Sequence, residues 1–119
     1  MPKFPFEMVP LPQERSTLKP RTTGLTMMVD FGVPVGKLED LLVLVGPHVD
    51  LIKIAVGSAR LYRETYLGQK IRLCEGFDVK PFIGGQFLEY VVATQGFEAA
   101  PAFYKEAKRM GTMTNFKYS

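Results

Sequence analysis

The chain has 119 residues, of which 46% are hydrophobic and 23% are charged, and its formal net charge at pH 7 is +3. This length suits one small domain with a buried core, because domains cluster around ~100–150 residues. Basic residues are scattered among acidic ones and form no stripe with interleaved aromatics, which argues against nucleic acid as a partner. No apolar run approaches the ~18 residues of a membrane span. The amino terminus lacks the apolar core of a signal peptide, and the single cysteine, Cys74, fits a reducing compartment. We therefore expect a cytoplasmic protein without membrane contact.

Residues 1–20 hold several prolines between short apolar pieces. They predict a proline-rich amino-terminal arm that lies on the surface or plugs one end of the fold, with a partly disordered tail as the alternative. A first strand follows at residues 25–29 and is closed by Asp30. Side chains alternate along a strand, so Asp30 shares a face with Thr26 and Met28.

The central strand, residues 50–56, is the most informative stretch, because Lys53 interrupts an otherwise apolar run. A lysine inside a sheet is costly unless its face opens into a polar cavity near the end of the strand. A third strand, residues 79–83, contains Pro81, which requires a bulge or an unpaired amide. Apolar residues recur at helical spacing between and after the strands and predict four helices, at residues 36–45, 61–75, 85–93 and 98–110.

Alternation of strands and helices predicts an α/β fold with parallel strands. All three strands end in polar or glycine-rich turns, at 30–32, 57–59 and 84–86. In α/β folds the chemistry gathers at the carboxyl ends of the strands. The domain is predicted to span residues 21–111. Residues 112–119 carry few core residues where a fourth strand is due, which predicts an atypical tail left by truncation.

Several ordered, correctly spaced motifs resemble the phosphosulfolactate synthase family, which joins sulfite to phosphoenolpyruvate, and its plant heat-stress-associated relatives. The matching pieces are Lys-Pro-Arg-Thr-Thr-Gly-Leu-Thr at 19–26, Val-Asp-Phe-Gly at 29–32, Asp-Leu-Leu at 40–42, Asp-Leu-Ile-Lys-Ile-Ala-Val-Gly-Ser-Ala at 50–59, Lys-Ile-Arg-Leu at 70–73 and Gly-Gly-Gln-Phe-Leu-Glu at 84–89. The resemblance implies the amino-terminal part, about three βα units, of a TIM-type (β/α)8 barrel. It also implies Mg²⁺-dependent addition of sulfite to phosphoenolpyruvate. Gln86 stands where the family usually has threonine, which replaces a hydroxyl contact with an amide contact.

Two charged residues are the catalytic candidates. Asp30 is a plausible oxygen ligand for Mg²⁺, although a strand-end aspartate can also simply cap the following turn. The ammonium of Lys53 could hold the substrate carboxylate or phosphate and deliver a proton. The alternative for Lys53 is a side chain that extends to water at the rim.

The substrate-binding candidates are Gly84, Gly85 and Gln86, whose free amides open a helix and suit an anion, and Ser58, which could hydrogen-bond substrate. Glu89, one turn into that helix, is the second metal-ligand candidate. The alternative for the paired glycines is an ordinary tight turn that binds no ligand. The alternative for Glu89 is a glutamate whose charge simply stabilises the positive end of the helix dipole.

Three other interpretations stay open at this point. Lys53 could form a Schiff base in an aldolase-like barrel, or the chain could be a non-catalytic barrel protein of the heat-stress type, kept for protection or protein interaction. The half-barrel could also pair its open sheet edges, and we expect a homo-oligomer.

Overall fold

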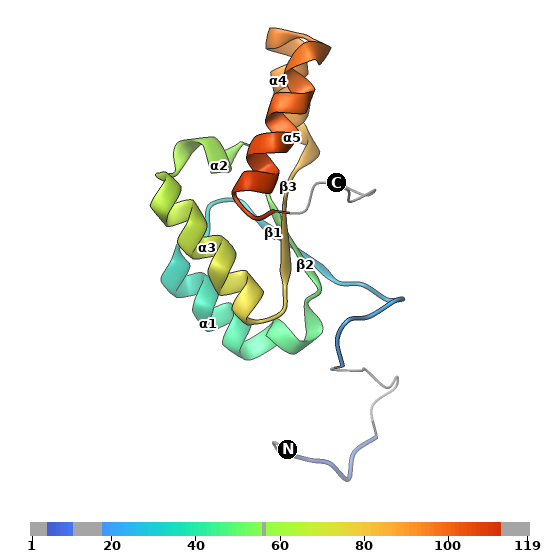
Figure 1. Ribbon diagram of the computed structural model, residues 1–119. Coiled ribbons are helices and arrows are strands. Elements are labelled where there is room, and N and C mark those ends of the chain that lie inside the picture. Colours follow the sequence, from blue (N-terminus) through green and yellow to red (C-terminus); the bar gives the residue numbers. More distant parts are fainter. Residues whose placement is uncertain (1–4, 11–17, 56, 113–119) are drawn as a thin grey trace.

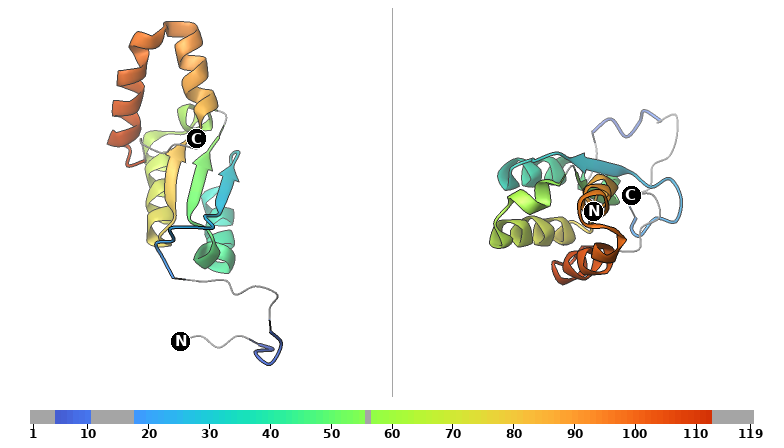
Figure 2. Two further views of the ribbon diagram at one scale, coloured as in Figure 1. Left: turned by 90° about the vertical axis from the view of Figure 1, so that its right-hand side faces the viewer. Right: turned by 90° about the horizontal axis from the view of Figure 1, so that it is seen from above.

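The computed structural model describes residues 5–10, 18–55 and 57–112. Its centre is a three-stranded parallel sheet in the order β1 (Met27–Asp30), β2 (Leu51–Ile54) and β3 (Lys80–Ile83). The strands lie side by side with their carboxyl ends at one edge (Figures 1 and 2). Three parallel strands alternating with helices are what the first units of a TIM-type barrel contain, so the predicted fold class is confirmed.

Two helices cover one face of this sheet, as the view from above shows (Figure 2). They are α1 (Val35–Val45) and α3 (Glu64–Gly76). The predicted helix at 61–75 is in fact interrupted, because the backbone of Tyr62 and Arg63 is extended between α2 (Ser58–Leu61) and α3. A 3₁₀ turn, η1 (Gly46–His48), connects α1 to β2.

The last part of the chain is a helical hairpin. It consists of α4 (Gly85–Gln95), the 3₁₀ turn η2 (Phe97–Ala99) and α5 (Ala100–Arg109). The hairpin rises beyond the carboxyl ends of the strands and α5 returns toward the sheet (Figures 1 and 2). The chain therefore places α4 over the edge where α/β folds keep their chemistry.

The buried core lies between the sheet and the two covering helices. One cluster joins helix α1 to the sheet and to the end of α3: Leu38, Leu42, Val49, Ile52, Cys74 and Val79. A second cluster lies nearer the carboxyl ends of the strands: Ile54, Leu67 and Ile71. Helical spacing places Leu67, Ile71 and Cys74 on the inner face of the predicted helix at 61–75, and all three are buried.

An ion pair fastens the opposite, amino-terminal edge of the sheet. Arg21 Nη1 lies 2.5 Å from Asp50 Oδ1, and the second oxygen of Asp50 accepts a hydrogen bond from the Thr26 amide at 2.9 Å. Burial raises the pKa of Asp50, but the Thr26 amide and the Arg21 guanidinium outweigh it and hold that pKa below its ordinary value. This edge is structural and lies away from the turns that end the strands.

Pro81 fits into β3 without interrupting the pairing with β2, in which it stands opposite Ile52. The amide of Lys80 donates to the carbonyl of Asp50, just before β2, and the amide of Gly84 donates to the carbonyl of Ile54, both at 3.0 Å. Amides on one strand alternate between its two sides, so the nitrogen of Pro81 faces the free edge of β3. Of the two options that the sequence left open, the unpaired amide is the one realised.

The predicted arm and tail lie mostly outside the described residues, which include only 5–10 and 18–20 of the arm and residue 112 of the tail. Across the described residues, every helix is too short or too polar to cross a membrane.

Candidate functional site

Lys53 lies on the sheet face opposite the covering helices. The register aligns it with Val29 of β1 and Phe82 of β3, whereas its neighbours Ile52 and Ile54 point into the helix-covered core. Lys53 is half-buried. Its aliphatic stem passes against the backbone of Gly84, because a Cβ placed on Gly84 would lie 2.7 Å from Lys53 Cε and 3.4 Å from its Cγ. The structure thus brings Lys53 to the glycine turn that opens α4.

Gly84 is the residue before the first turn of α4, and its backbone is extended, with φ −67° and ψ 150°. Any residue could adopt this conformation, so the close approach of Lys53, rather than backbone geometry, favours glycine here. Gly85 and Gln86 follow as the first residues of the helix, and Gln86 is exposed. Free amides and the positive end of the helix dipole make this terminus suitable for an anion. The stem of Lys53 brings a basic side chain to the same turn.

Ser58 stands at the end of the neighbouring loop. The residue before it, Gly57, has a positive φ of 74°, and a Cβ there would contact the ring of Phe87 in α4 at 3.8 Å. Ser58 is 8% exposed, and its hydroxyl oxygen is buried without a hydrogen-bond partner among the described residues. A buried hydroxyl without a partner is costly, so it marks a place where a ligand or water would complete the bonding.

Asp30 lies on the other face of the sheet from Lys53, so the two residues do not share a site. It pairs with Ile54 in the register and lies on the helix-covered face, fully buried. Its Oδ1 accepts hydrogen bonds from the amides of Gly32 and Val33 at 2.8 and 2.6 Å, and its Oδ2 lies 2.5 Å from Lys70 Nζ. Asp30 therefore caps the turn after β1, and the structure does not bring it together with Lys53.

The metal-ligand candidates can be compared with what Mg²⁺ requires, which is several free oxygens in octahedral geometry. Both oxygens of Asp30 are already engaged, one of them by a cation. Glu89 is exposed on α4, and the described residues contain no cluster of three or more His, Cys, Asp or Glu side chains that could hold a metal ion. As placed here, these residues do not fit a Mg²⁺ site of their own.

Lys70 and Tyr62 form a part of this region for which the sequence predicted no role. Lys70 is fully buried, and its Nζ donates to Asp30 and, at 3.3 Å, to the hydroxyl of Tyr62. A signal for Lys70 was present, because it lies on the apolar stripe of α3 between Leu67 and Ile71. A charge on such a stripe needs a buried partner, by the same reasoning that singled out Lys53.

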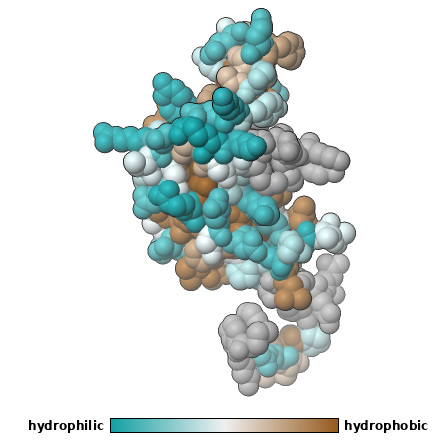
Figure 3. Space-filling model, viewed as in Figure 1, coloured by the Kyte–Doolittle hydropathy of each residue, from teal (hydrophilic) through white to brown (hydrophobic). Residues whose placement is uncertain are grey.

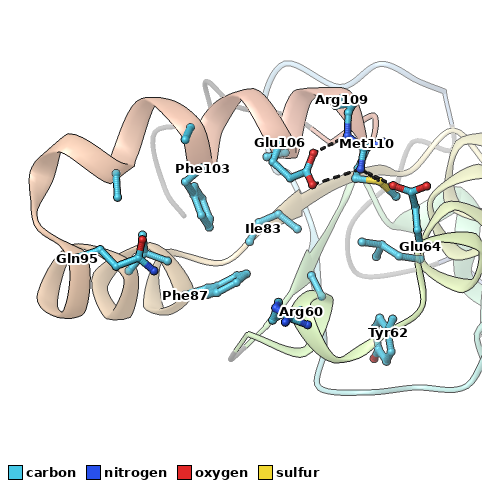
Figure 4. Close-up of a pocket in the computed structure, with 16 residues that line it drawn as sticks. Arg60, Tyr62, Glu64, Ile83, Phe87, Gln95, Phe103, Glu106, Arg109 and Met110 are labelled. Atoms are coloured by element: carbon cyan, nitrogen blue, oxygen red, sulfur yellow. Dashed lines mark hydrogen bonds and ion pairs between the residues drawn. The ribbon is translucent and has the colours of Figure 1, made fainter.

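A cleft of about 510 Å³ lies between α2, α3 and the helical hairpin. Phe87 and Phe103 extend into it from the two arms of the hairpin, and Arg109 bridges Glu106 and Glu64 at its rim (Figure 4). Hydrophilic residues dominate this face of the molecule, with hydrophobic residues visible in the hollow between α3 and α5 (Figure 3). None of the predicted site residues lines this cleft. The cleft therefore gives no support to the predicted site residues.

Comparison with known proteins gives consistent matches. The family model of (2R)-phospho-3-sulfolactate synthase (ComA) matches residues 14–114. A phosphosulfolactate synthase of Methanothermobacter thermautotrophicus is 31% identical over 96 residues, which cover 81% of this chain and 36% of that protein. Phosphosulfolactate synthases of Methanocaldococcus jannaschii and Bacillus subtilis are 27% identical over 88 residues and 30% identical over 77 residues, covering 74% and 65% of this chain. The chain spans about a third of the length of these curated relatives.

Proposed function

Because the chain belongs to the (2R)-phospho-3-sulfolactate synthase family, we propose that it forms the anion-binding edge of a barrel that adds sulfite to phosphoenolpyruvate. The observation that carries this proposal is the packing of Lys53 against Gly84 at the amino end of α4. The relatives described above are named as synthases, which does not favour a non-catalytic barrel.

Both substrates of this reaction are anions, and the proposed site gathers groups that bind anions. Lys53 supplies a positive charge on a half-buried stem, and the first turn of α4 supplies free amides at Gly85 and Gln86. The buried hydroxyl of Ser58 is available to donate one further hydrogen bond. We assign these groups to the carboxylate or phosphate of phosphoenolpyruvate, because a cation and a helix terminus both stabilise such groups.

The chemistry asks for charge stabilisation and one proton. The sulfur lone pair of sulfite attacks the methylene carbon, and the electrons of the carbon–carbon double bond move into the carboxylate to form an enolate. A proton is then added to the carbon that carries the phosphate. Lys53 stabilises the enolate charge, a contribution that often dominates catalysis, and its ammonium is the candidate proton donor.

Mg²⁺ dependence remains a prediction from the resemblance, but Asp30 and Glu89, as placed here, do not fit the ion as its ligands. Because Asp30 has both oxygens engaged, the steps assigned to this chain do not depend on the metal.

The direct test is a chimera in which residues 19–111 replace the aligned segment of the Methanothermobacter synthase. We expect the chimera to form a sulfonated product from sulfite and phosphoenolpyruvate. Substitution Lys53→Met, which keeps the stem and removes the charge, should lower kcat/KM by at least ~100-fold, in the range seen when a charge-stabilising donor is removed. The matched control is Lys80→Met on the exposed residue of β3, which should change the rate little.

A folded chimera without sulfonated product would refute the proposed function, and equal rates with and without the Lys53 charge would refute the assigned role. Borohydride trapping in the presence of a carbonyl substrate separates the aldolase-like alternative, since sulfite addition forms no imine. We expect no trapped adduct at Lys53.

A further inference from the structure

The loop between β1 and α1 is anchored by a chain of buried polar contacts from α3. Lys70 Nζ lies 2.5 Å from Asp30 Oδ2, and Asp30 Oδ1 accepts the amides of Gly32 and Val33. One turn earlier in α3, the hydroxyl of Tyr66 accepts the amide of Val35 at 2.8 Å. Three backbone amides around this loop are therefore held by α3: one donates to Tyr66 itself, and two donate to Asp30, whose other oxygen contacts Lys70.

The same lysine contacts the connection that leads into α3. Its Nζ lies 3.3 Å from the Tyr62 hydroxyl and 4.8 Å from the centre of the Tyr62 ring. Tyr62 also reaches the first loop, because a Cβ on Gly32 would lie 3.8 Å from its hydroxyl. Lys70 thus contacts groups that follow β1 and groups that follow β2, and both connections lie at the carboxyl edge of the sheet, as does the Lys53–Gly84 contact.

Burial argues that this ion pair does more than stabilise the fold. Lys70 and Asp30 are both fully buried. A buried ion pair can often be replaced by apolar residues of similar volume without loss of stability, because desolvation offsets the attraction. What an apolar pair cannot supply is orientation: the ammonium fixes one carboxylate oxygen, so that the other faces two consecutive amides. Lys70 is also on the helix-covered face, away from any substrate held by Lys53.

We propose that Lys70 is a positioning residue, which through Asp30 and Tyr62 holds the β1–α1 loop and the entry to α3 in one arrangement at the carboxyl edge of the sheet. Tyr66 and Lys70 are spaced four residues apart in α3, so they face the loop from the same side of the helix, and Tyr62 lies in the extended connection that precedes α3. The inference does not depend on the synthase reaction, because it concerns only how this edge is held in place.

Amide hydrogen exchange of the 119-residue chain tests it. In Lys70→Met, exchange at Gly32 and Val33 should accelerate by ~10- to 100-fold more than exchange at the fully buried Leu42, which reports global opening. The matched control is Ile71→Ala, the next residue on α3, which is also buried but packs against Ile54 and Leu67. It should accelerate exchange at the loop and at Leu42 to the same extent.

A second variant keeps the test decisive if the unpaired carboxylate of Lys70→Met prevents folding. The double substitution Asp30→Asn with Lys70→Met removes both charges and leaves an oxygen that can accept the two amides. We expect it to fold and still to show at least ~tenfold faster exchange at Gly32 and Val33 than the unaltered chain. Loop protection equal to that of the unaltered chain, or equal acceleration at Leu42 in Lys70→Met, would overturn the inference.

Discussion

Substitution of Gly84 by alanine tests whether close contact with the backbone places the Lys53 ammonium. The new Cβ would lie 2.7 Å from Lys53 Cε. Carbon atoms in ordinary contact lie ~3.5–4.0 Å apart, so Cε must retreat by about 1 Å. The Cγ atom, at 3.4 Å, restricts the movement of the stem at its other end. Gly84→Ala therefore displaces the charge without removing it.

The expected cost falls on binding and not on folding. The extended backbone of Gly84 suits alanine, and a compatible Gly→Ala change stabilises by ~0.4–1 kcal/mol through the unfolded chain. A hydrogen bond between charged groups contributes ~1.5–3 kcal/mol. We therefore expect affinity for phosphoenolpyruvate to fall by ~10-fold or more, with a Tm within a few degrees of the unaltered chain.

The assay is a titration with phosphoenolpyruvate followed at the backbone amides of residues 84–86, paired with a thermal unfolding curve. Gly36→Ala in α1 is the matched control, because a Cβ there meets no atom within 4 Å. It should leave affinity unchanged. Unchanged affinity in Gly84→Ala as well would refute the contact-based placement of Lys53, and a large loss of Tm would show that the glycine serves folding instead.

Three further predictions concern the ion pair at the amino-terminal edge, the thiol and the core. The lowered pKa of Asp50, ordinarily near 3.8, gives a contribution to stability that is complete above that value and is lost as the pH falls through the folded pKa. Arg21→Met should therefore lower Tm at pH 7 and should make Tm fall less steeply as the pH is lowered from about 4 to 2. An unchanged dependence of Tm on pH in this range would contradict the prediction. Burial, together with the Asp30 carboxylate, raises the pKa of Cys74 to about 11. A thiol reagent at pH 8 should therefore label the folded chain at least ~100-fold more slowly than the unfolded chain. Equal labelling rates would contradict this prediction. Leu42→Ala, at a fully buried position, should cost ~2–5 kcal/mol of unfolding free energy in urea, whereas the exposed Leu44→Ala should cost less than ~0.5 kcal/mol; similar losses would place the core elsewhere.

Residue pattern was sufficient to predict the order and type of the main elements. Alternating strands and helical stripes gave three parallel strands with helices between them, and the stripe at Leu67, Ile71 and Cys74 is buried as expected. The break at Tyr62 and Arg63 could not be read from that stripe, because apolar spacing continues through the extended residues between α2 and α3. Element boundaries depend on local backbone conformation, which spacing does not report.

The candidate site was predictable only in part. A charge within an apolar strand singled out Lys53, but its contact with Gly84 was not predicted and comes from the structure alone. Asp30 was harder, since alternation orders the side chains of one strand but does not relate one strand to the next. The register, which pairs Asp30 with Ile54, places it on the face opposite Lys53. Its partner Lys70 lies 40 residues along the chain, and without the packing of α3 against β1 nothing in the sequence pairs the two.

The most direct test of the account is a phosphoenolpyruvate titration of the unaltered chain compared with Lys53→Met. We expect saturable shifts at the amides of Gly85 and Gln86, with affinity at least ~tenfold weaker once the lysine charge is removed. Shifts that are absent, or that are equally strong without the charge, would contradict the claim that Lys53 and the first turn of α4 form an anion-binding edge.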